Sequence, residues 1–86
     1  MAEYSLIVKP SASKEIDTLG TRADRQRVVH RVHALAHDPR PHGSQKLSGA
    51  EKYRVRCGIF RIVYLIYDSA RVVEVIKVGH RRDVYR

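Results

Sequence analysis

Short runs of β-branched and aromatic residues flank a longer stretch with helical periodicity, and together they predict six elements. Residues Tyr4–Val8 form the first predicted strand, which Pro10 ends. Three more strands are predicted in the second half of the chain, at about Lys52–Cys57, Phe60–Tyr67 and Val72–Val78. Two helices predicted between the first strand and these three complete the order β-α-α-β-β-β.

Capping residues and apolar spacing define the two helices. Ser11 is the candidate cap of a short first helix, which Gly20 stops. Thr21 opens the second helix with Asp24 three residues later, the spacing of a capping box, and this helix is expected to run to about His37. Its apolar stripe consists of Val28, Val29, Val32, Leu35 and Ala36. Because the connection between the helices is tight, they are expected to form a hairpin.

The element order predicts a single α+β domain over residues 1–86, with an antiparallel sheet and the helical hairpin packed on one of its faces. Residues 40–50, rich in Pro, Gly and Ser, are a predicted loop. The longest apolar runs are too short to cross a bilayer, and the N-terminus does not resemble a signal peptide. The single cysteine, Cys57, excludes an internal disulfide. We therefore expect a cytoplasmic protein that does not contact membranes.

The charge of the chain is uneven along its length. The formal net charge is +8. Residues 1–39 hold 6 basic and 5 acidic side chains, whereas residues 40–86 hold 11 basic and 4 acidic ones. A half-domain this basic attracts polyanions, so nucleic acid or an acidic protein is the expected partner.

The basic residues of the second half gather on one face of a predicted hairpin. Gly58 suits the first central position of a two-residue type II′ turn. That turn pairs Cys57 with Phe60, Arg56 with Arg61, Val55 with Ile62 and Tyr53 with Tyr64. One face is then apolar, with Cys57 toward the core, and the other carries Arg54, Arg56 and Arg61. Two arginines across a strand pair repel each other, so the simplest reason to gather them is a bound anion, most naturally a phosphate.

Two apolar residues, Val63 and Leu65, fall on the same face as the three arginines. If the helices cover only the opposite face, both side chains are exposed beside the basic residues. An exposed apolar strip suggests a protein partner in addition to a nucleic acid.

The C-terminal segment adds two groups that can transfer protons or contact bases. His80 could transfer protons near neutral pH, and Tyr85 could stack on a base or act as an acid or base. His30, His33 and His37 share one face of the second helix, but no further ligand is evidently placed to complete a zinc site. We therefore expect neither a metal nor another cofactor.

Four segments carry a resemblance to the RelE-type toxins of the RelE/ParE toxin–antitoxin superfamily. They are Lys46–Gly49, Tyr53–Arg56, Phe60–Tyr64 and Val78–Tyr85. Each segment alone is common, but their spacing and the predicted element order match together, so the resemblance covers nearly the whole chain. It implies a RelE-like, microbial-ribonuclease-like fold.

The resemblance also implies an activity and partners. The expected activity is that of a ribosome-dependent endoribonuclease, which cleaves mRNA in the ribosomal A site without a metal. In this reaction the 2′-hydroxyl attacks the adjacent phosphate. The expected partners are a RelB-like antitoxin covering Val63 and Leu65, the 70S ribosome with its mRNA, and operator DNA reached only through the antitoxin complex.

The resemblance further assigns roles to single residues. Arg61 and Arg81 are expected to bind the scissile phosphate, and Tyr85 to stack on the substrate base and assist proton transfer. The candidate catalytic residues are Arg61, Arg81, Tyr85 and His80, and the candidate RNA- or phosphate-binding residues are Arg54, Arg56, Lys52, Lys46 and Arg82.

One departure from the family pattern leaves the general base open, and the overall function also has alternatives. Arg54 and Arg56 stand where relatives often have lysines, and an arginine cannot give up its proton, so the general base is Tyr85, His80 or Glu51. A ParE-like inhibitor of DNA gyrase, or a non-catalytic component of an autorepressing toxin–antitoxin DNA-binding complex, are the alternative functions. The joint presence of Arg61, Arg81 and Tyr85 favours the nuclease.

Overall fold

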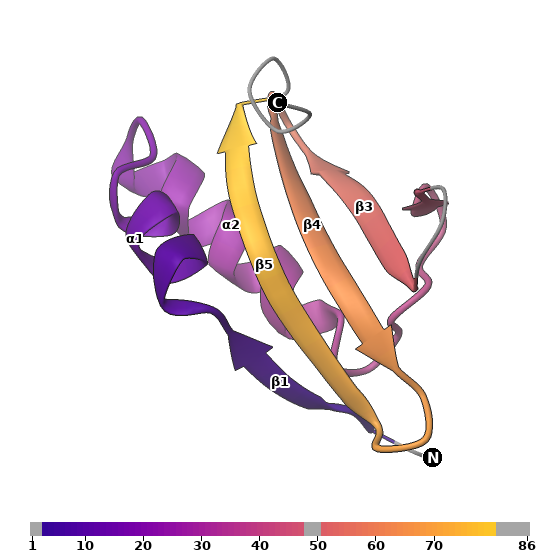
Figure 1. Ribbon diagram of the computed structural model, residues 1–86. Coiled ribbons are helices and arrows are strands. Elements are labelled where there is room, and N and C mark those ends of the chain that lie inside the picture. Colours follow the sequence, from indigo (N-terminus) through magenta and orange to yellow (C-terminus); the bar gives the residue numbers. More distant parts are fainter. Residues whose placement is uncertain (1–2, 48–50, 81–86) are drawn as a thin grey trace.

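Two helices cover one face of a five-stranded sheet in the computed structural model, which describes residues 3–47 and 51–80 (Figure 1). The elements are β1 (Ser5–Val8), α1 (Pro10–Asp17), α2 (Arg22–Ala34), β2 (Gln45–Lys46), β3 (Lys52–Cys57), β4 (Phe60–Tyr67) and β5 (Val72–His80). The strands are arranged in the order β1-β5-β4-β3-β2. The α+β class and the face-covering helices are confirmed, and β3 and β4 have the bounds predicted from the sequence.

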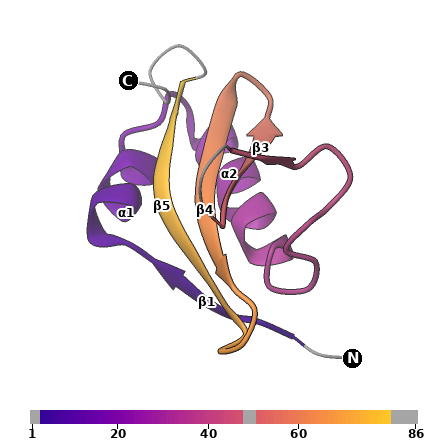
Figure 2. The same cartoon turned by 45° about the vertical axis from the view of Figure 1, so that its right-hand side comes forward.

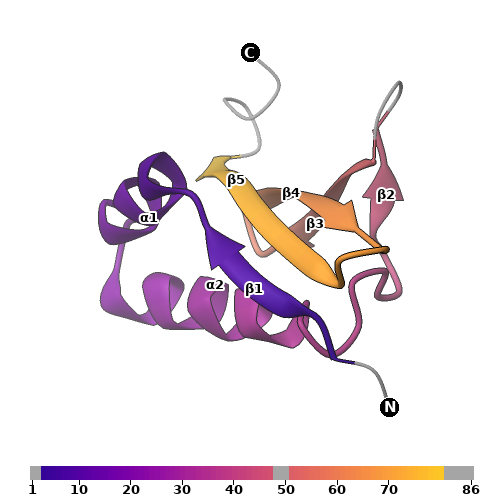
Figure 3. The same ribbon diagram turned by 60° about the horizontal axis from the view of Figure 1, so that its bottom comes forward.

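The sheet is mixed: the antiparallel pairing predicted for the last three strands is confirmed, and the first strand departs from it. β1 runs parallel to β5, with Ser5 opposite Val72 and Val8 opposite Val75, while the other three strand pairs are antiparallel. The parallel pair is possible because both helices lie between these strands in the chain and carry it across the sheet. The predicted loop also contains the two-residue strand β2, which adds to the outer edge of β3 (Figure 3).

The two helices begin in different ways. α2 has the predicted capping box: the Thr21 hydroxyl accepts from the Asp24 amide at 3.1 Å, and the Asp24 carboxylate accepts from the Thr21 amide at 3.3 Å. α1 instead begins at Pro10, with Lys9 as a cap that makes no side-chain bond, so the prediction for Ser11 is wrong. Proline suits the first helical turn because its fixed φ is helical and the missing N–H has no partner there.

The core lies between the helices and the covered face of the sheet (Figure 2). Its buried side chains are Ala12, Ile16, Leu19, Val28, Val32, Leu35, Tyr53, Val55, Phe60, Ile62, Tyr64, Ile66, Val73, Val75 and Val78. Alternate residues of β3 and β4 supply the sheet side, as the period of two requires. Val29 is 40% exposed, because its position on α2 directs the side chain away from the sheet, whereas Val28 and Val32 face the sheet and are buried. No helix among the described residues is long and apolar enough to span a bilayer.

A network around Arg40 joins the segment after α2 to the turn between β4 and β5. Its guanidinium donates to the Asp68 carboxylate at 2.8 Å and to the Tyr53 hydroxyl at 3.1 Å. Tyr4 donates to the same carboxylate at 2.6 Å. The Arg40 hydrogen bond, assisted by that of Tyr4, lowers the pKa of Asp68 to about 2. These contacts join four separate segments of the chain at the end of the sheet away from the β3–β4 turn.

Candidate functional site

The hairpin of β3 and β4 has the register predicted from the sequence. Cys57 lies opposite Phe60, Arg56 opposite Arg61, Val55 opposite Ile62, and Tyr53 opposite Tyr64. Gly58 has a φ of +62°, and its turn partner Ile59 does not have a positive φ, as a type II′ turn requires. The turn chemistry therefore fixes which side chains share each face of the sheet.

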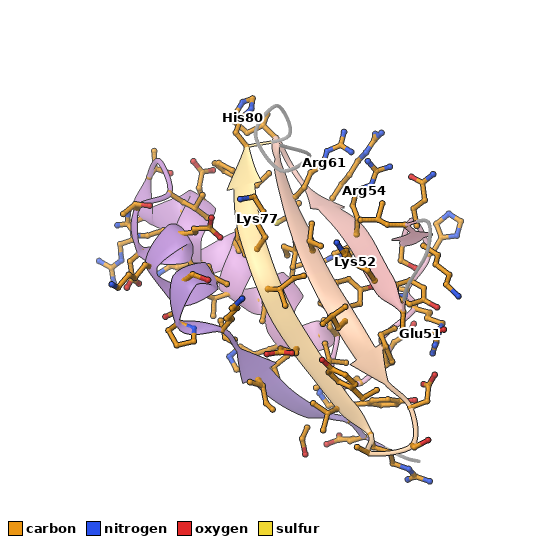
Figure 4. All side chains as sticks on the ribbon, viewed as in Figure 1. Glu51, Lys52, Arg54, Arg61, Lys77 and His80 are labelled. Carbon is orange, nitrogen blue, oxygen red and sulfur yellow. The ribbon has the colours of Figure 1, made fainter. Side chains whose placement is uncertain are left out.

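Five cations lie together on the face of the sheet opposite the helices. Lys52, Arg54 and Arg56 come from β3, Arg61 from β4 and Lys77 from β5, and we call this set the basic face. Four of the five are labelled in Figure 4, where they lie over three adjacent strands on the side that the helices leave open. Arg56 is directly opposite Arg61, and Lys77 and Arg54 flank Val63 from opposite sides.

The acidic residues around the basic face lie at its borders. Glu15 of α1 lies 3.6 Å from the Lys77 ammonium and accepts a hydrogen bond from the Val78 amide at 2.9 Å. Glu74 is opposite Leu65 on the same face, near the end of β5 that lies away from Gly79. Its carboxylate accepts a hydrogen bond from the Tyr67 hydroxyl at 3.0 Å. The Arg54 guanidinium donates to the neutral side chain of Gln45 on β2. Positive charge is therefore concentrated at the end of the face near the β3–β4 turn, and this charge distribution attracts anions.

The two apolar residues expected on this face differ in exposure. Val63 is only 4% exposed, so its predicted exposure is wrong. It lies in the central strand β4 between Arg54 and Lys77, and the alkyl stems of such long side chains cover apolar neighbours. Leu65, between Lys52 and Glu74, is half-buried.

Two candidates project away from the basic face. Lys46 is opposite Tyr53, so it shares the side of the sheet that the helices cover, and its ammonium lies 3.2 Å from a Glu51 carboxylate oxygen. His80 is opposite Phe60, and the two rings make an edge-to-face contact at 6.4 Å. Because Phe60 belongs to the core face, His80 lies on the other side of the sheet from Arg61.

The remaining candidates lie elsewhere in the chain. Glu51, considered as a base, stands before β3 at the end away from Arg56 and within 3.7 Å of the Arg40 guanidinium (Figure 4). Arg81, Arg82 and Tyr85 lie outside the described residues. Gly79, near the end of β5, is directly opposite Arg61, so β5 ends at the basic end of the sheet.

Lys77 was not identified from the sequence, and a bulge explains why. Val73 and Val75 face the core, so regular alternation would also turn Lys77 toward the core. The register shifts between Val63 and Tyr64, whose partners are Lys77 and Val75, and this leaves Ile76 unpaired. The extra residue reverses the alternation and places Lys77 on the basic face. The sequence does carry a signal. Lys77 alternates with the buried Val78 and with Gly79, so Lys77 and Gly79 share the face opposite Val78, but this can be used only once the strand order is known.

Two ionisable groups near the site, Tyr64 and Cys57, have raised pKa values and do not supply proton chemistry. Burial raises the pKa of Tyr64 to about 12, and its hydroxyl donates to the Pro39 carbonyl at 2.7 Å. Burial also raises the pKa of the Cys57 thiol, so it has little thiolate character.

Within residues 3–47 and 51–80, no three His, Cys, Asp or Glu side chains are grouped to hold a metal, the three histidines of the α2 region included.

Known proteins share both the sequence pattern and the fold. The family model described as ParE toxin of type II toxin-antitoxin system, parDE, matches residues 6–85. No curated protein sequence matches the chain. The E. coli RelBE toxin–antitoxin complex contains a chain 28% identical to this one, covering 90% of this chain and 95% of that chain, with a TM-score of 0.76.

Two further solved structures extend the comparison. A variant of E. coli toxin RelE in complex with an antitoxin RelBc peptide is 30% identical, covers 99% of this chain and 92% of that chain, and has a TM-score of 0.68. A chain of the archaeal RelE–RelB complex from Pyrococcus horikoshii is 23% identical over 98% of this chain and 100% of that chain, with a TM-score of 0.82, and shows the fold alone. The chain therefore belongs to the ParE toxin family of type II toxin–antitoxin systems, within the RelE/ParE superfamily.

Proposed function

We propose that this toxin is a ribosome-dependent endoribonuclease that cuts mRNA in the A site without a metal. The observation that carries the proposal is the pairing of Arg56 with Arg61, with Arg54 beside them, on a sheet face that the helices leave open. Such a set of guanidinium groups suits the charge that develops on a phosphate during cleavage. The identity of 28% to 30% with E. coli RelE chains supports the same assignment.

The proposed reaction is an attack of the ribose 2′-oxygen on the adjacent phosphorus. A base takes the 2′-hydroxyl proton, the bond from phosphorus to the 5′-oxygen breaks, and an acid protonates that leaving oxygen. The products are a 2′,3′-cyclic phosphate and a 5′-hydroxyl. Arg61, with Arg81, stabilises the negative charge on the phosphate oxygens, and Arg54, Arg56 and Lys52 neutralise the flanking phosphates.

The proton transfers need a group other than the arginines, because a guanidinium keeps its proton. Of the three candidates, His80 packs against Phe60 on the far side of the sheet, and Glu51 is engaged with Lys46 and Arg40. Tyr85 is therefore the residue that we propose as the proton-transfer group and as the platform on which the base stacks.

The specific alternative is inhibition of DNA gyrase. It is favoured by the family model that matches residues 6–85, since that model describes ParE toxins. The basic face would also attract DNA, because the charge of the phosphate backbone is the same. The residues proposed for cleavage separate the two functions, since a gyrase inhibitor does not need Tyr85 for proton transfer.

The proposed protein partner is a RelB-like antitoxin with acidic or amphipathic helices that covers the basic face and Leu65. Solved relatives are toxin–antitoxin complexes, which supports this proposal. Operator DNA would be reached only through that complex, and the toxin is expected to act in the cytoplasm on the 70S ribosome. Replacing Leu65 with Asp should weaken the antitoxin complex, and unchanged affinity would count against the contact. Val63 is too buried for a direct role unless the partner displaces its neighbours.

Mapping of transcript ends after induction in cells tests the nuclease proposal. We expect cuts in translated messages in phase with codons, and their loss in Arg61→Ala and Tyr85→Phe. Arg71→Ala is the matched control, because Arg71 lies in the turn between β4 and β5, away from the basic face. Intact messages together with DNA damage would instead support gyrase inhibition.

A further inference from the structure

A second group of arginines lines a groove between α2 and the outer edge of β3. The groove has a volume of about 660 Å³, and its basic lining comes from Arg27, His30 and Arg31 of α2 and from Arg56 of β3. The edge of β3 is open here because β2 pairs only with Tyr53 and Arg54. Neither α2 nor β3 alone forms this surface, since the spacing of Arg27 and Arg31 places both on the helix face toward the strand edge.

The positive charge of the groove is only partly neutralised. Arg27 makes an ion pair with Asp24 at 2.6 Å. All ion pairs found among the described residues involve cations other than Arg31 and Arg56. The Nε atom of Arg31 is buried and has no hydrogen-bond partner in the described part of the chain. Arg27 and Arg31 are also like charges one helical turn apart, which costs stability in a helix.

Arg56 connects this groove to the basic face. Its backbone position is opposite Arg61, while its exposed side chain also lines the groove beside Cys57. An RNA strand whose phosphates lie on the basic face can therefore continue around the edge of β3 to Arg31 and stay beside positively charged side chains. This continuity follows from the short length of β2, which leaves the last residues of β3 uncovered.

The composition of the groove favours a nucleic acid over a protein. Protein-binding sites are built around large apolar or aromatic anchors. The large apolar side chains that are exposed among the described residues, Ile7, Val29, Ile59 and Tyr67, all lie outside this groove. Arginines without acidic partners are instead the typical ligands of backbone phosphates.

We propose that the groove between α2 and the edge of β3 is a second phosphate-binding site, which holds the RNA strand flanking the segment bound on the basic face. Arg31 and Arg56 contact its phosphates, and Arg27 contributes when Asp24 releases it. The proposal rests on the function proposed above, because the RNA must first lie on the basic face.

The test is binding of a fluorescent, 2′-O-methylated single-stranded RNA to the full chain, followed by anisotropy over a range of salt concentrations. The affinity falls with salt, and each lost phosphate contact reduces the steepness of log K against log salt by about 0.7 for a single strand. We expect Arg31→Gln to lose about one such contact and to bind on the order of fivefold more weakly at low salt. Arg31→Lys keeps the charge and should keep the slope. Arg22→Gln, which removes the same charge from α2 outside the groove, is the matched control.

Each other result overturns the proposal in a recognisable way. If Arg31→Gln behaves like Arg22→Gln while Arg54→Gln weakens binding, the groove is not a phosphate site, and the basic face stands. If Arg31→Lys weakens RNA binding as much as Arg31→Gln does, the loss of affinity comes from altered packing and not from the lost charge. If no variant of either surface weakens RNA binding, both proposals fail. If Arg31→Gln spares RNA but weakens binding of a polyglutamate peptide in the same assay, the groove binds an acidic protein segment instead.

Discussion

Replacing Arg56 with Gln should make the protein more stable and a poorer binder of RNA. Arg56 and Arg61 face each other across β3 and β4. Directly opposite residues of an antiparallel pair have Cβ atoms roughly 5 Å apart, and unfavourable pairs at this spacing cost about 0.2–1 kcal/mol. A domain of this size gains about 4–8 °C of melting temperature per kcal/mol, so the expected rise is about 1–8 °C.

Thermal unfolding followed by circular dichroism measures the change, and salt identifies its cause. The Debye length falls from about 10 Å at 0.1 M to about 3 Å at 1 M ionic strength, so the stability gained by Arg56→Gln should fade at high salt. Arg71→Gln is the control, because it removes one exposed charge from the β4–β5 turn, where the register places no cation opposite it. A lower melting temperature for Arg56→Gln, or a gain equal to that of Arg71→Gln, would refute the idea that the cations are gathered at a cost to stability.

Three further predictions concern the frame that positions the basic face. Thr21→Ala removes the cap of α2 and should cost about 1 kcal/mol in denaturant unfolding, with a Ser replacement restoring most of the loss. Tyr64→Phe leaves the Pro39 carbonyl without its donor and should cost about 1–3 kcal/mol in the same assay; an unchanged midpoint would show that the bond contributes nothing. The pKa of Asp68 is lowered to about 2 by Arg40, so its stabilising contribution is complete above about pH 4 and is lost as pH falls toward 2. The stability difference between the wild type and Asp68→Asn should therefore shrink over that pH range, and a difference that stays constant would contradict the assignment.

The sequence was sufficient where local rules act. The β3–β4 hairpin follows from Gly58 and from strict alternation, because a slip of one residue would move every apolar side chain to the wrong face. The cap of α2 follows in the same way from Thr21 and Asp24, three residues apart.

Features that depend on distant contacts could not be predicted. The parallel pairing of β1 with β5 joins residues more than sixty positions apart, and no local signal marks its direction. The bulge at Ile76 decides that Lys77 joins the basic face, and with it His80 is placed beside Phe60 rather than beside Arg61. Val63 is buried although it shares a face with the arginines, and its neighbours across the sheet, Arg54 and Lys77, come from two other strands. The roles of Arg81, Arg82 and Tyr85 stay predictions, because these residues lie outside the described chain.

Cleavage of an mRNA held in the ribosomal A site, with the 2′-hydroxyl of the nucleotide at the cut replaced by hydrogen, tests the central claim most directly. Primer extension on purified ribosome complexes would report the cut, and the chemistry of the new ends would report the mechanism. The account predicts cutting of the ribose substrate to a 2′,3′-cyclic phosphate and a 5′-hydroxyl, no cutting of the deoxy substrate, and no cutting by Arg61→Ala. Equal cutting of both substrates, or none of either by the wild type, would contradict it.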